Sequence, residues 1–225
     1  MAEPAPSPAP GSAARVPSSA IKRRVLVVGC AHSGGALVRR LLAGFPGVYD
    51  LGESGVFLEL SARPRRRRPW TLLGLSIGRE RRCLGELVAR TYGDRPEAAP
   101  PLPPRDARLG RALGGTVATL DRMALAAGCR SWVEYTPGLV LRARALERVI
   151  PRLRVVHVVR DGRDVVASHC VQAARRRGGA CRLADARRAI DAWNRAIAVH
   201  ARCFGRSGHQ FVFYEDLLHH PRREI

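Results

Sequence analysis

The chain has 225 residues, of which 46% are hydrophobic, and its formal net charge at pH 7 is +20. This length and apolar content predict one globular domain with a core of ordinary size. No apolar run approaches the roughly 18 residues that a membrane span requires, and no signal-peptide core stands at the start, so we expect a cytoplasmic protein without a membrane span.

The positive charge comes from 39 Lys and Arg residues against 19 Asp and Glu residues. Such a balance favours an anionic partner, of which nucleic acid is one class. However, Lys22 is the only lysine, and the excess of arginine with Ala, Gly and Pro is typical of a GC-rich coding bias. Aromatic residues, at 5%, rarely interleave with the basic runs, which disfavours single-strand binding. We therefore expect an anionic cofactor and no specific nucleic acid, with a basic polyanion binder as a lesser alternative.

The six cysteines are scattered and show no Cys-x-x-Cys pair or Cys/His ligand spacing. This pattern predicts no zinc or other metal site. It is typical of mostly buried thiols in a reducing compartment. These cysteines are Cys30, Cys83, Cys129, Cys170, Cys181 and Cys203.

The first segments in chain order are a tail and a phosphate-cradling unit. Residues 1–20 are Pro, Ala and Ser with few large apolar side chains, which predicts a disordered tail before a domain over residues 21–225. Val25–Gly29 has the pattern of a buried strand, and a glycine-rich loop and an amphipathic helix follow it. Glycines let the backbone approach phosphate oxygens in such a loop. A Walker A loop is disfavoured, because Gly34-Gly35-Ala36 stands where Gly-Lys-Ser/Thr would be required.

The middle of the chain is predicted to be mainly helical. Glu53 falls in the first turn of a helix through Leu60, where a carboxylate suits the helix dipole. Further predicted elements are a solvated arginine loop over 63–70, helices over 72–92 and 109–127, a proline-rich loop over 96–104, a strand entering a turn over 131–137, and a helix over 139–149.

A second strand-to-helix turn lies over residues 154–168. Val155–Val159 predicts a strand buried on both faces, and Arg160-Asp161-Gly162 predicts a tight turn into a helix. Arg160 then lies at the strand's carboxyl end, and Ser168 faces back toward it from about two turns into the helix. A guanidinium and a hydroxyl that converge in this way form a phosphate clamp. The residues also allow a solvated turn in which Arg160 pairs with Asp161 or Asp164.

A long helix over 184–203 and a last strand with its turn over 210–218 complete the pattern. Four predicted strands alternate with helices, which predicts an α/β protein with a parallel sheet. Two phosphate-binding turns at strand ends favour a P-loop-like three-layer sandwich.

The segment Arg160-Asp161-Gly162-Arg163-Asp164-Val165-Val166-Ala167-Ser168 resembles the 3′-phosphate-binding segment of sulfotransferases that use 3′-phosphoadenosine 5′-phosphosulfate (PAPS). The resemblance implies that Arg160 and Ser168 hold the 3′-phosphate. The glycine-rich loop is similar to this family's 5′-phosphosulfate loop, Pro-Arg/Lys-Ser-Gly-Thr-Thr. It implies donor binding by His32, Ser33, Gly34, Gly35 and Ala36, with His32 in place of the basic residue and Gly35 and Ala36 in place of the threonines.

Other segments extend the resemblance from Val25 to Pro221. Glu53 matches the family's Gly-Glu, whose glutamate is the catalytic base in many members, and His32 would stabilise the leaving phosphate. Glu134-Tyr135-Thr136-Pro137 is similar to Glu-Lys-Thr-Pro of bacterial members, with Tyr135 in place of the lysine. Trp193 and Tyr214-Glu215-Asp216-Leu217 resemble further family landmarks; such a tryptophan is otherwise a core residue.

The resemblance is to the bacterial or tyrosylprotein-sulfotransferase-like branch, and it implies the sulfotransferase fold. The implied activity is sulfuryl transfer from PAPS, without a metal, to a hydroxyl on a small molecule, a glycan or a peptide. A catalytically inactive, nucleotide-binding sulfotransferase-like protein is the alternative, because His32 and Tyr135 replace basic residues. Family members usually continue beyond the segment that matches residue 225, so we expect the C-terminal part of the domain to be missing.

Overall fold

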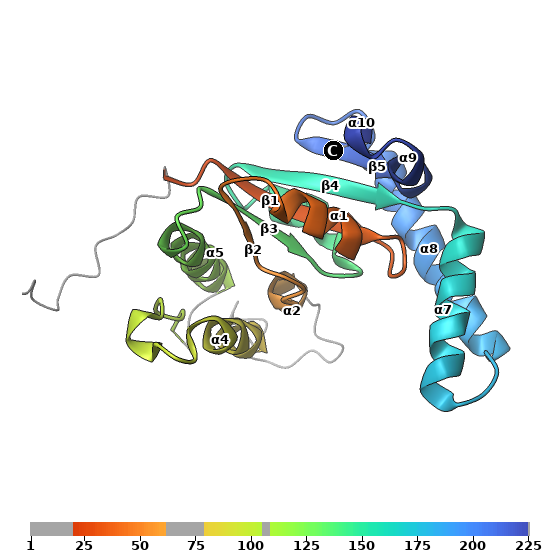
Figure 1. Ribbon diagram of the computed structural model, residues 1–225, viewed down its shortest axis with the longest axis horizontal. Helices are drawn as coiled ribbons and strands as arrows, with labels where there is room; N and C mark the ends of the chain where they lie inside the picture. The colour runs from red at the N-terminus through yellow and green to blue at the C-terminus, as the bar shows by residue number, and fades with distance from the viewer. Residues whose placement is uncertain (1–19, 62–78, 105–108, 225) are drawn as a thin grey trace, which may run out of the picture.

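The computed structural model describes residues 20–61, 79–104 and 109–224. In this part of the chain, five parallel strands form one sheet in the order β2-β3-β1-β4-β5 (Figure 1). The strands are β1 (Arg23–Gly29), β2 (Val48–Asp50), β3 (Ser131–Tyr135), β4 (Leu153–Val159) and β5 (His209–Phe213). Because β1 lies at the centre, the loop that follows it has a strand end on each side.

Helices cover both faces of this sheet and make it the middle of three layers. The first layer holds α1 (Gly35–Ala43) and α9 (Tyr214–His219), which pack on Val27, Val158 and neighbouring strand residues. The second face packs against α2 (Val56–Ser61), α4 (Arg79–Tyr92), α5 (Leu109–Ala126), η3 (Leu139–Arg142), α6 (Ala143–Glu147) and α8 (Leu183–Cys203). Helix α7 (Gly162–Arg177) packs against α8, and the short η2 (Pro96–Ala98) and α10 (Pro221–Glu224) complete the described elements.

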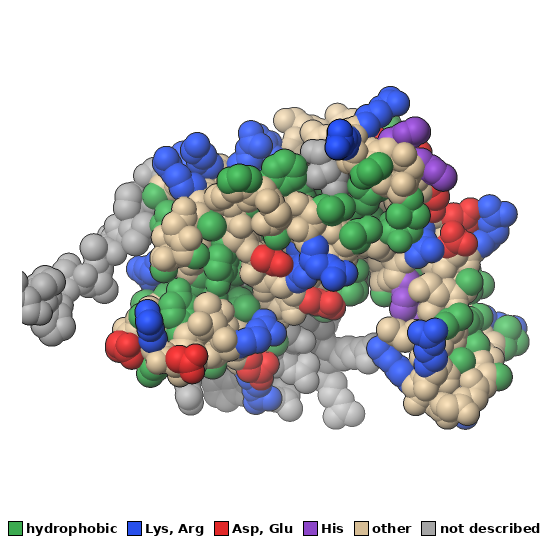
Figure 2. All heavy atoms as spheres, in the orientation of Figure 1, with side chains coloured by type: hydrophobic (Ala, Val, Ile, Leu, Met, Phe, Trp, Pro, Cys, Tyr) green, Lys and Arg blue, Asp and Glu red, His purple; other side chains and the backbone are tan. Residues whose placement is uncertain are grey.

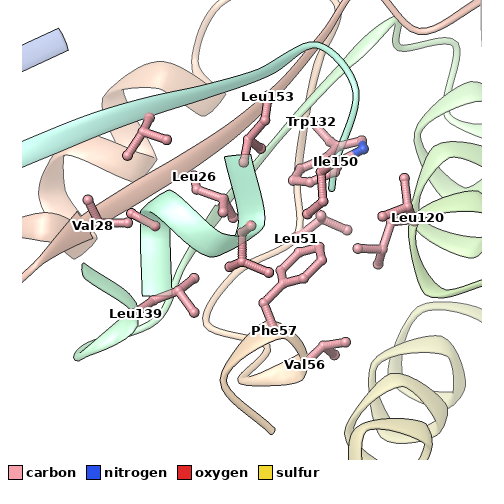
Figure 3. Close-up of a cluster of buried hydrophobic side chains, with 14 of the residues drawn as sticks. Leu26, Val28, Leu51, Val56, Phe57, Leu120, Trp132, Leu139, Ile150 and Leu153 are labelled. Carbon is pink, nitrogen blue, oxygen red and sulfur yellow. The ribbon is translucent and has the colours of Figure 1, made fainter. Parts of the chain in front are cut away.

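The strands alternate their side chains between the two layers, as a sheet covered on both faces requires. Leu26 and Val28 enter the larger core, whereas Val27 enters the smaller one. In the larger core, the rings of Phe57 and Trp132 stack with centroids 5.9 Å apart (Figure 3). The apolar run of β1 is therefore explained by burial on both faces.

A buried ion pair ties β1 to α5 inside this core. Asp121 accepts hydrogen bonds from Arg24 Nη2 (2.6 Å), Arg24 Nε (3.0 Å) and Trp132 Nε1 (2.9 Å). Arg24 is 1% exposed. Removal of either charged partner would leave the other buried and unpaired, which is far more costly than the loss of a surface pair.

The predicted α/β fold with a parallel sheet in three layers is confirmed, and the differences are local. Strand β2 was not predicted, because it is a three-residue strand at the edge of the sheet. The predicted helix over 139–149 is divided into η3 and α6. Glu53 does not lie in a helical first turn, since α2 begins only at Val56. The tail over 1–19, the arginine loop over 63–70 and the start of the helix over 72–92 lie outside the described residues.

The cysteines differ from the prediction of mostly buried thiols. Cys170 on α7 and Cys181, just before α8, form a disulfide with their Cα atoms 5.0 Å apart. Cys30 and Cys203 are buried free thiols, whereas Cys83 and Cys129 are partly exposed. The prediction thus fails for the pair that joins α7 to the segment before α8.

The described helices include none with the length and apolar character to cross a membrane. Figure 2 shows that Lys and Arg side chains are spread over the visible face and interspersed with Asp and Glu. The described residues on this face therefore form no continuous basic track of the kind that follows a nucleic-acid backbone.

Candidate functional site

The candidate site lies where three neighbouring strands end. The carboxyl ends of parallel strands share one edge of a sheet, and ligands of open α/β sheets bind there. The loop after β1, the turn after β4 and the end of β3 meet at this edge, and Figure 1 shows β4 running into α7 there. The two turns that the sequence identified as phosphate-binding are therefore neighbours in space.

The loop after β1 depends on glycines because two aromatic rings lie against it. A Cβ atom at Gly34 would come within 2.2 Å of the Tyr214 ring, and one at Gly35 within 2.2 Å of the Tyr135 ring. Gly34 also has φ +91°, in the left-handed region, which disfavours any other residue. The loop can adopt this conformation only if both positions are glycine, because a side chain at either one would overlap an aromatic ring.

The N-terminus of α1 is open to an anion. Gly34 is its N-cap and supplies no side-chain cap hydrogen bond. The first amides of a helix have no intrahelical acceptor, and the helix dipole is positive there. The backbone N–H groups of Gly35 and Ala36, at the start of α1, can therefore hold phosphate or sulfate oxygens.

Ser33 has a different position from the one that a phosphate-binding hydroxyl would need. It is 1% exposed, and its Oγ donates to the Cys30 carbonyl at 2.7 Å. Its backbone N–H bonds to the same carbonyl at 3.2 Å. In this conformation both donors of Ser33 brace the loop from inside.

Arg160 connects the turn after β4 to this loop. Its Nη1 donates to the His32 carbonyl at 3.1 Å, and its guanidinium lies 4.5 Å from the centroid of the Tyr214 ring. Its Nε is buried and has no hydrogen-bond partner among the described residues. Trp193 Nε1 donates to the Arg160 carbonyl at 3.0 Å and fixes the backbone at this position. Arg160 thus faces the loop with a donor still unsatisfied.

The solvated-turn alternative accounts for little of this geometry. Arg160 Nη2 lies 3.8 Å from Asp164 Oδ2, and the Asp164 side chain is 59% exposed, so this pair is worth little. Asp161 instead binds Arg163 and caps α7 by accepting its backbone N–H at 2.8 Å. A carboxylate therefore already occupies the N-terminus of α7, and the helix end available to an anion is that of α1.

Ser168 and His32 meet beside Arg160. Ser168 Oγ lies 3.2 Å from His32 Nδ1, and the His169 ring packs edge-on against the His32 ring. Burial lowers the pKa of His32, and the charges of His169, Arg176 and Arg160 lower it further. His32 is therefore a neutral hydrogen-bonding group at pH 7, in contrast to the arginine or lysine of the resembled loop.

A carboxylate pair lies on the β3 side of the site. Glu53 is exposed, whereas Glu134 is buried and accepts hydrogen bonds at Oε1 from the Ser54 hydroxyl (3.0 Å) and the Thr136 hydroxyl. Burial raises the pKa of Glu134 to about 7, and the charge of Glu53 acts in the same direction. Gly55 N–H donates to Thr136 Oγ1 at 3.0 Å. This network ties the segment that carries Glu53 to β3.

Sequence reasoning missed three contributors to the site. Tyr214 was identified only as part of a landmark segment, although its ring touches both Gly34 and Arg160. Glu134 was identified only as part of the segment Glu134-Tyr135-Thr136-Pro137. Its burial could not be predicted from the sequence. His169, next to Ser168, packs against the His32 ring and was not identified from the sequence as a site residue. Each acts through a contact that is distant in the sequence, which residue types alone do not reveal.

A sequence profile of the Sulfotransferase family matches residues 24–225, nearly the whole chain. The chain belongs to this family. No curated protein matches the chain significantly in sequence. The membership of the sulfotransferase family that the resemblance implied is therefore confirmed. The matched residues include the loop after β1 and the turn after β4.

Solved sulfotransferases share the fold of this chain. The sulfotransferase domain from the curacin biosynthetic pathway is 17% identical, with a TM-score of 0.56 over 91% of this chain and 71% of that one. The sulfotransferase domain of the Synechococcus PCC 7002 olefin synthase is 18% identical, with a TM-score of 0.53 over 91% and 70%. Sulfotransferase STF1 from Mycobacterium tuberculosis H37Rv is 20% identical, with a TM-score of 0.50 over 90% and 65%. The P-loop-like sulfotransferase fold is thereby shown.

Proposed function

We propose that the protein transfers a sulfuryl group from PAPS to a hydroxyl acceptor. The observation that carries this proposal is the convergence of Arg160, Ser168 and His32 beside the open N-terminus of α1. The donor carries two anionic groups, a 3′-phosphate and a 5′-phosphosulfate, and needs an anion site for each of them. The guanidinium and hydroxyl supply one, and the loop amides supply the other.

In this assignment Arg160 and Ser168 bind the 3′-phosphate of the donor. The buried, unpartnered Nε of Arg160 supports this role, because a bound phosphate oxygen would satisfy it. The cation–π contact with Tyr214 and the hydrogen bond to the His32 carbonyl keep the guanidinium oriented before the donor arrives. This preorganisation lowers the entropic cost of binding.

The backbone amides at Gly34, Gly35 and Ala36 bind the 5′-phosphosulfate. These amides stabilise charge that develops on the bridging oxygen as the sulfuryl group leaves. His32, neutral at pH 7, adds a hydrogen bond but no charge. The site therefore relies on dipoles where the resembled loop places a full positive charge.

Glu53 is the proposed base, since it is exposed at the edge of the site on a segment braced against β3. The acceptor oxygen attacks sulfur, the bond between sulfur and the bridging oxygen breaks, and the acceptor proton passes to Glu53. The products are a sulfate ester and 3′-phosphoadenosine 5′-phosphate (PAP), so atoms and charge balance. Correct positioning of the two reactants supplies most of the acceleration.

The acceptor site is proposed to adjoin Glu53 and to admit a hydroxyl of a small molecule, a glycan or a peptide. A groove of about 410 Å³ lies elsewhere, beside the start of α7, and is lined by Gly162, Val166, Ile190 and Trp193. Because Trp193 also holds the Arg160 backbone, this groove adjoins the proposed 3′-phosphate site. It offers apolar surface to the adenosine end of the donor.

The decisive experiment measures PAP binding by thermal shift and calorimetry. At a PAP concentration of about 100 times Kd, the wild-type protein should gain roughly 2.7 kcal/mol in its free energy of unfolding. Arg160→Ala should lose most of this gain. Arg148→Ala is the matched control, because Arg148 is an exposed arginine at the end of α6, beside the amino ends of β1 and β4 and away from the strand ends that form the site. No shift in wild type, or equal shifts in wild type and Arg160→Ala, would contradict the proposed donor site.

Sulfate transfer is tested separately with PAPS and a panel of hydroxyl acceptors, followed by PAP release and product mass. We expect acceptor-dependent PAP release that Glu53→Gln slows strongly while PAP affinity is kept. PAP binding without transfer to any acceptor would instead identify a nucleotide-binding protein without catalytic activity.

A further inference from the structure

A second cluster of reactive side chains lies in the protein interior, apart from the strand ends. His157 comes from β4, His209 from β5 and Cys203 from the last residue of α8, and all three are buried. One ring nitrogen of each histidine and the Cys203 sulfur lie within 4.8 Å of one another. None of these residues takes part in the proposed transfer, and their spacing in the sequence matches no metal motif.

Two further residues extend the cluster at its ends. His157 Nε2 lies 2.8 Å from His209 Nδ1, and His157 Nδ1 lies 2.8 Å from His200 Nδ1. At the other end, His209 Nε2 lies 3.1 Å from Glu147 Oε2. The His209 side chain is 0% exposed, and the alignment of this contact does not make a hydrogen bond, so its Nε2 is buried without one among the described residues. A fully buried imidazole with an unsatisfied nitrogen is costly unless something else satisfies it.

His157 and His209 each bring a ring nitrogen within 4.8 Å of the Cys203 sulfur, and an imidazole nitrogen binds a cation through its lone pair. The ring of Phe211 stacks on His157 with centroids 4.5 Å apart and the planes 6° from parallel, which holds the orientation of the imidazole.

We propose that His157, His209 and Cys203 bind one divalent transition-metal ion of the zinc class. Two imidazoles and a thiolate are a ligand set that Zn²⁺ prefers, and a water molecule would complete a tetrahedron. Coordination through His157 Nε2 and His209 Nδ1 needs these atoms to separate from 2.8 Å to about 3.3 Å, given Zn–N distances near 2.0 Å.

Polar groups that could act as outer partners lie beside the other ring nitrogens. With His157 Nε2 on the ion, Nδ1 faces His200. With His209 Nδ1 on the ion, Nε2 lies 3.1 Å from Glu147 Oε2, and a rotation of this carboxylate would align a hydrogen bond. Such partners fix the ring orientation and raise ligand basicity. The Cys203 thiol, whose pKa burial raises, loses its proton to the solvent when the ion binds, so one proton is released per ion.

The proposed ion is structural and joins the end of α8 to the two strands β4 and β5. Helix α8 also carries Trp193, whose indole holds the backbone of Arg160. Metal binding at the far end of α8 therefore stabilises the framework on which the anion site is built, without contact with the donor.

The test uses tag-free wild-type protein titrated with Co²⁺, a spectroscopic probe for zinc sites. We expect saturation at one ion per chain, with visible bands of tetrahedral Co²⁺ and a near-ultraviolet thiolate-to-cobalt band, both abolished by added Zn²⁺. Cys203→Ser should lose the thiolate band. Cys129→Ser is the matched control, since Cys129 is a free, partly exposed cysteine outside the cluster, and it should keep the band.

A second pair of variants protects the test against misfolding and against surface binding. Glu147→Gln changes a side chain that is 23% exposed, and it should weaken Co²⁺ affinity by about 10–100-fold while the fold is kept. His219 and His220 are exposed and adjacent in the sequence. Replacement of both by alanine should leave the Co²⁺ titration unchanged. No tetrahedral bands in wild type, a thiolate band that persists in Cys203→Ser, or loss of the bands in the His219/His220 variant would each overturn the proposal. PAPS is absent from every arm, so the result is independent of the proposed activity.

Discussion

The guanidinium of Arg160 lies over the ring of Tyr214, 4.5 Å from its centroid, and the same ring closes against Gly34. One aromatic side chain therefore touches both the turn after β4 and the loop after β1. This side chain sets the spacing between the two proposed anion sites. It belongs to α9, near the C-terminal end of the chain, whereas the loop after β1 lies near the N-terminal end.

Tyr214→Leu should weaken PAP binding by about 3–10-fold, because a contact of about 1 kcal/mol with the guanidinium is lost. Tyr214→Phe keeps the ring and should bind PAP as wild type does. Calorimetry on the three proteins checks this. If the Leu and Phe variants bind equally well, the ring has no role in holding Arg160.

Gly35→Ala should destabilise the protein by about 1–3 kcal/mol, since the new Cβ overlaps the buried Tyr135 ring. Chemical denaturation measures the free energy of unfolding. Gly114→Ala, in helix α5 with no atom within 4 Å of the new Cβ, is the control and should stabilise by up to about 1 kcal/mol. In a Tyr135→Leu background the cost of Gly35→Ala should fall; an unchanged cost would place the strain elsewhere.

Trp193→Phe removes the hydrogen bond to the Arg160 carbonyl and keeps most of the ring packing. A neutral hydrogen bond contributes about 1 kcal/mol, so we expect PAP affinity to fall several-fold with a small change in melting temperature. Surface plasmon resonance and thermal melting separate the two effects. Equal loss of stability and affinity would indicate a core role alone.

The free energy of unfolding of Glu134→Gln, measured relative to that of wild type, should increase as pH rises from 5 to 8. The pKa of Glu134 is raised from 4.5 to about 7 on folding, so between these values the folded state holds a proton that the unfolded state has released. Wild-type stability from this group is therefore present below pH 4.5 and lost as pH rises toward 7, by on the order of 3 kcal/mol. Denaturation curves at both pH values decide; a constant difference between the two proteins would contradict the raised pKa.

His32→Arg should raise turnover more than PAP affinity, because a full charge would stabilise the leaving group where a neutral imidazole now stands. The measurement is steady-state PAP release with a fixed acceptor. His32→Gln, an uncharged replacement, should show no such gain. Unchanged or lower turnover in His32→Arg would argue against this role for residue 32.

The parts of the fold that could be predicted are those in which burial leaves a local pattern. Strands β1 and β4 are apolar runs because both faces of the sheet are covered, and the break at Arg160 marks the strand end. Strand β2 leaves no such pattern, because three residues at a sheet edge carry too few buried positions. The position of Glu53 was assigned to a helix because a carboxylate before an apolar run resembles a helix start.

The candidate site was predictable where a strand-to-helix turn left a local pattern and where a segment resembled a known family. Both signals identified Arg160, Ser168 and the loop after β1, and the structure brings these elements together. The state of each group was not predictable, because it depends on neighbours from other strands. The lowered pKa of His32 and the inward hydrogen bond of Ser33 are both products of tertiary packing.

The central place of β1 has a consequence for how the chain assembles. Its neighbours β3 and β4 are both synthesised much later, and the ring that covers Gly34 comes later still. The glycine loop thus emerges early from the ribosome but obtains its supports only when most of the sequence has followed. Contacts between such distant segments slow folding, so a nascent chain that has not yet reached β4 leaves the first strand with an unpaired, aggregation-prone edge.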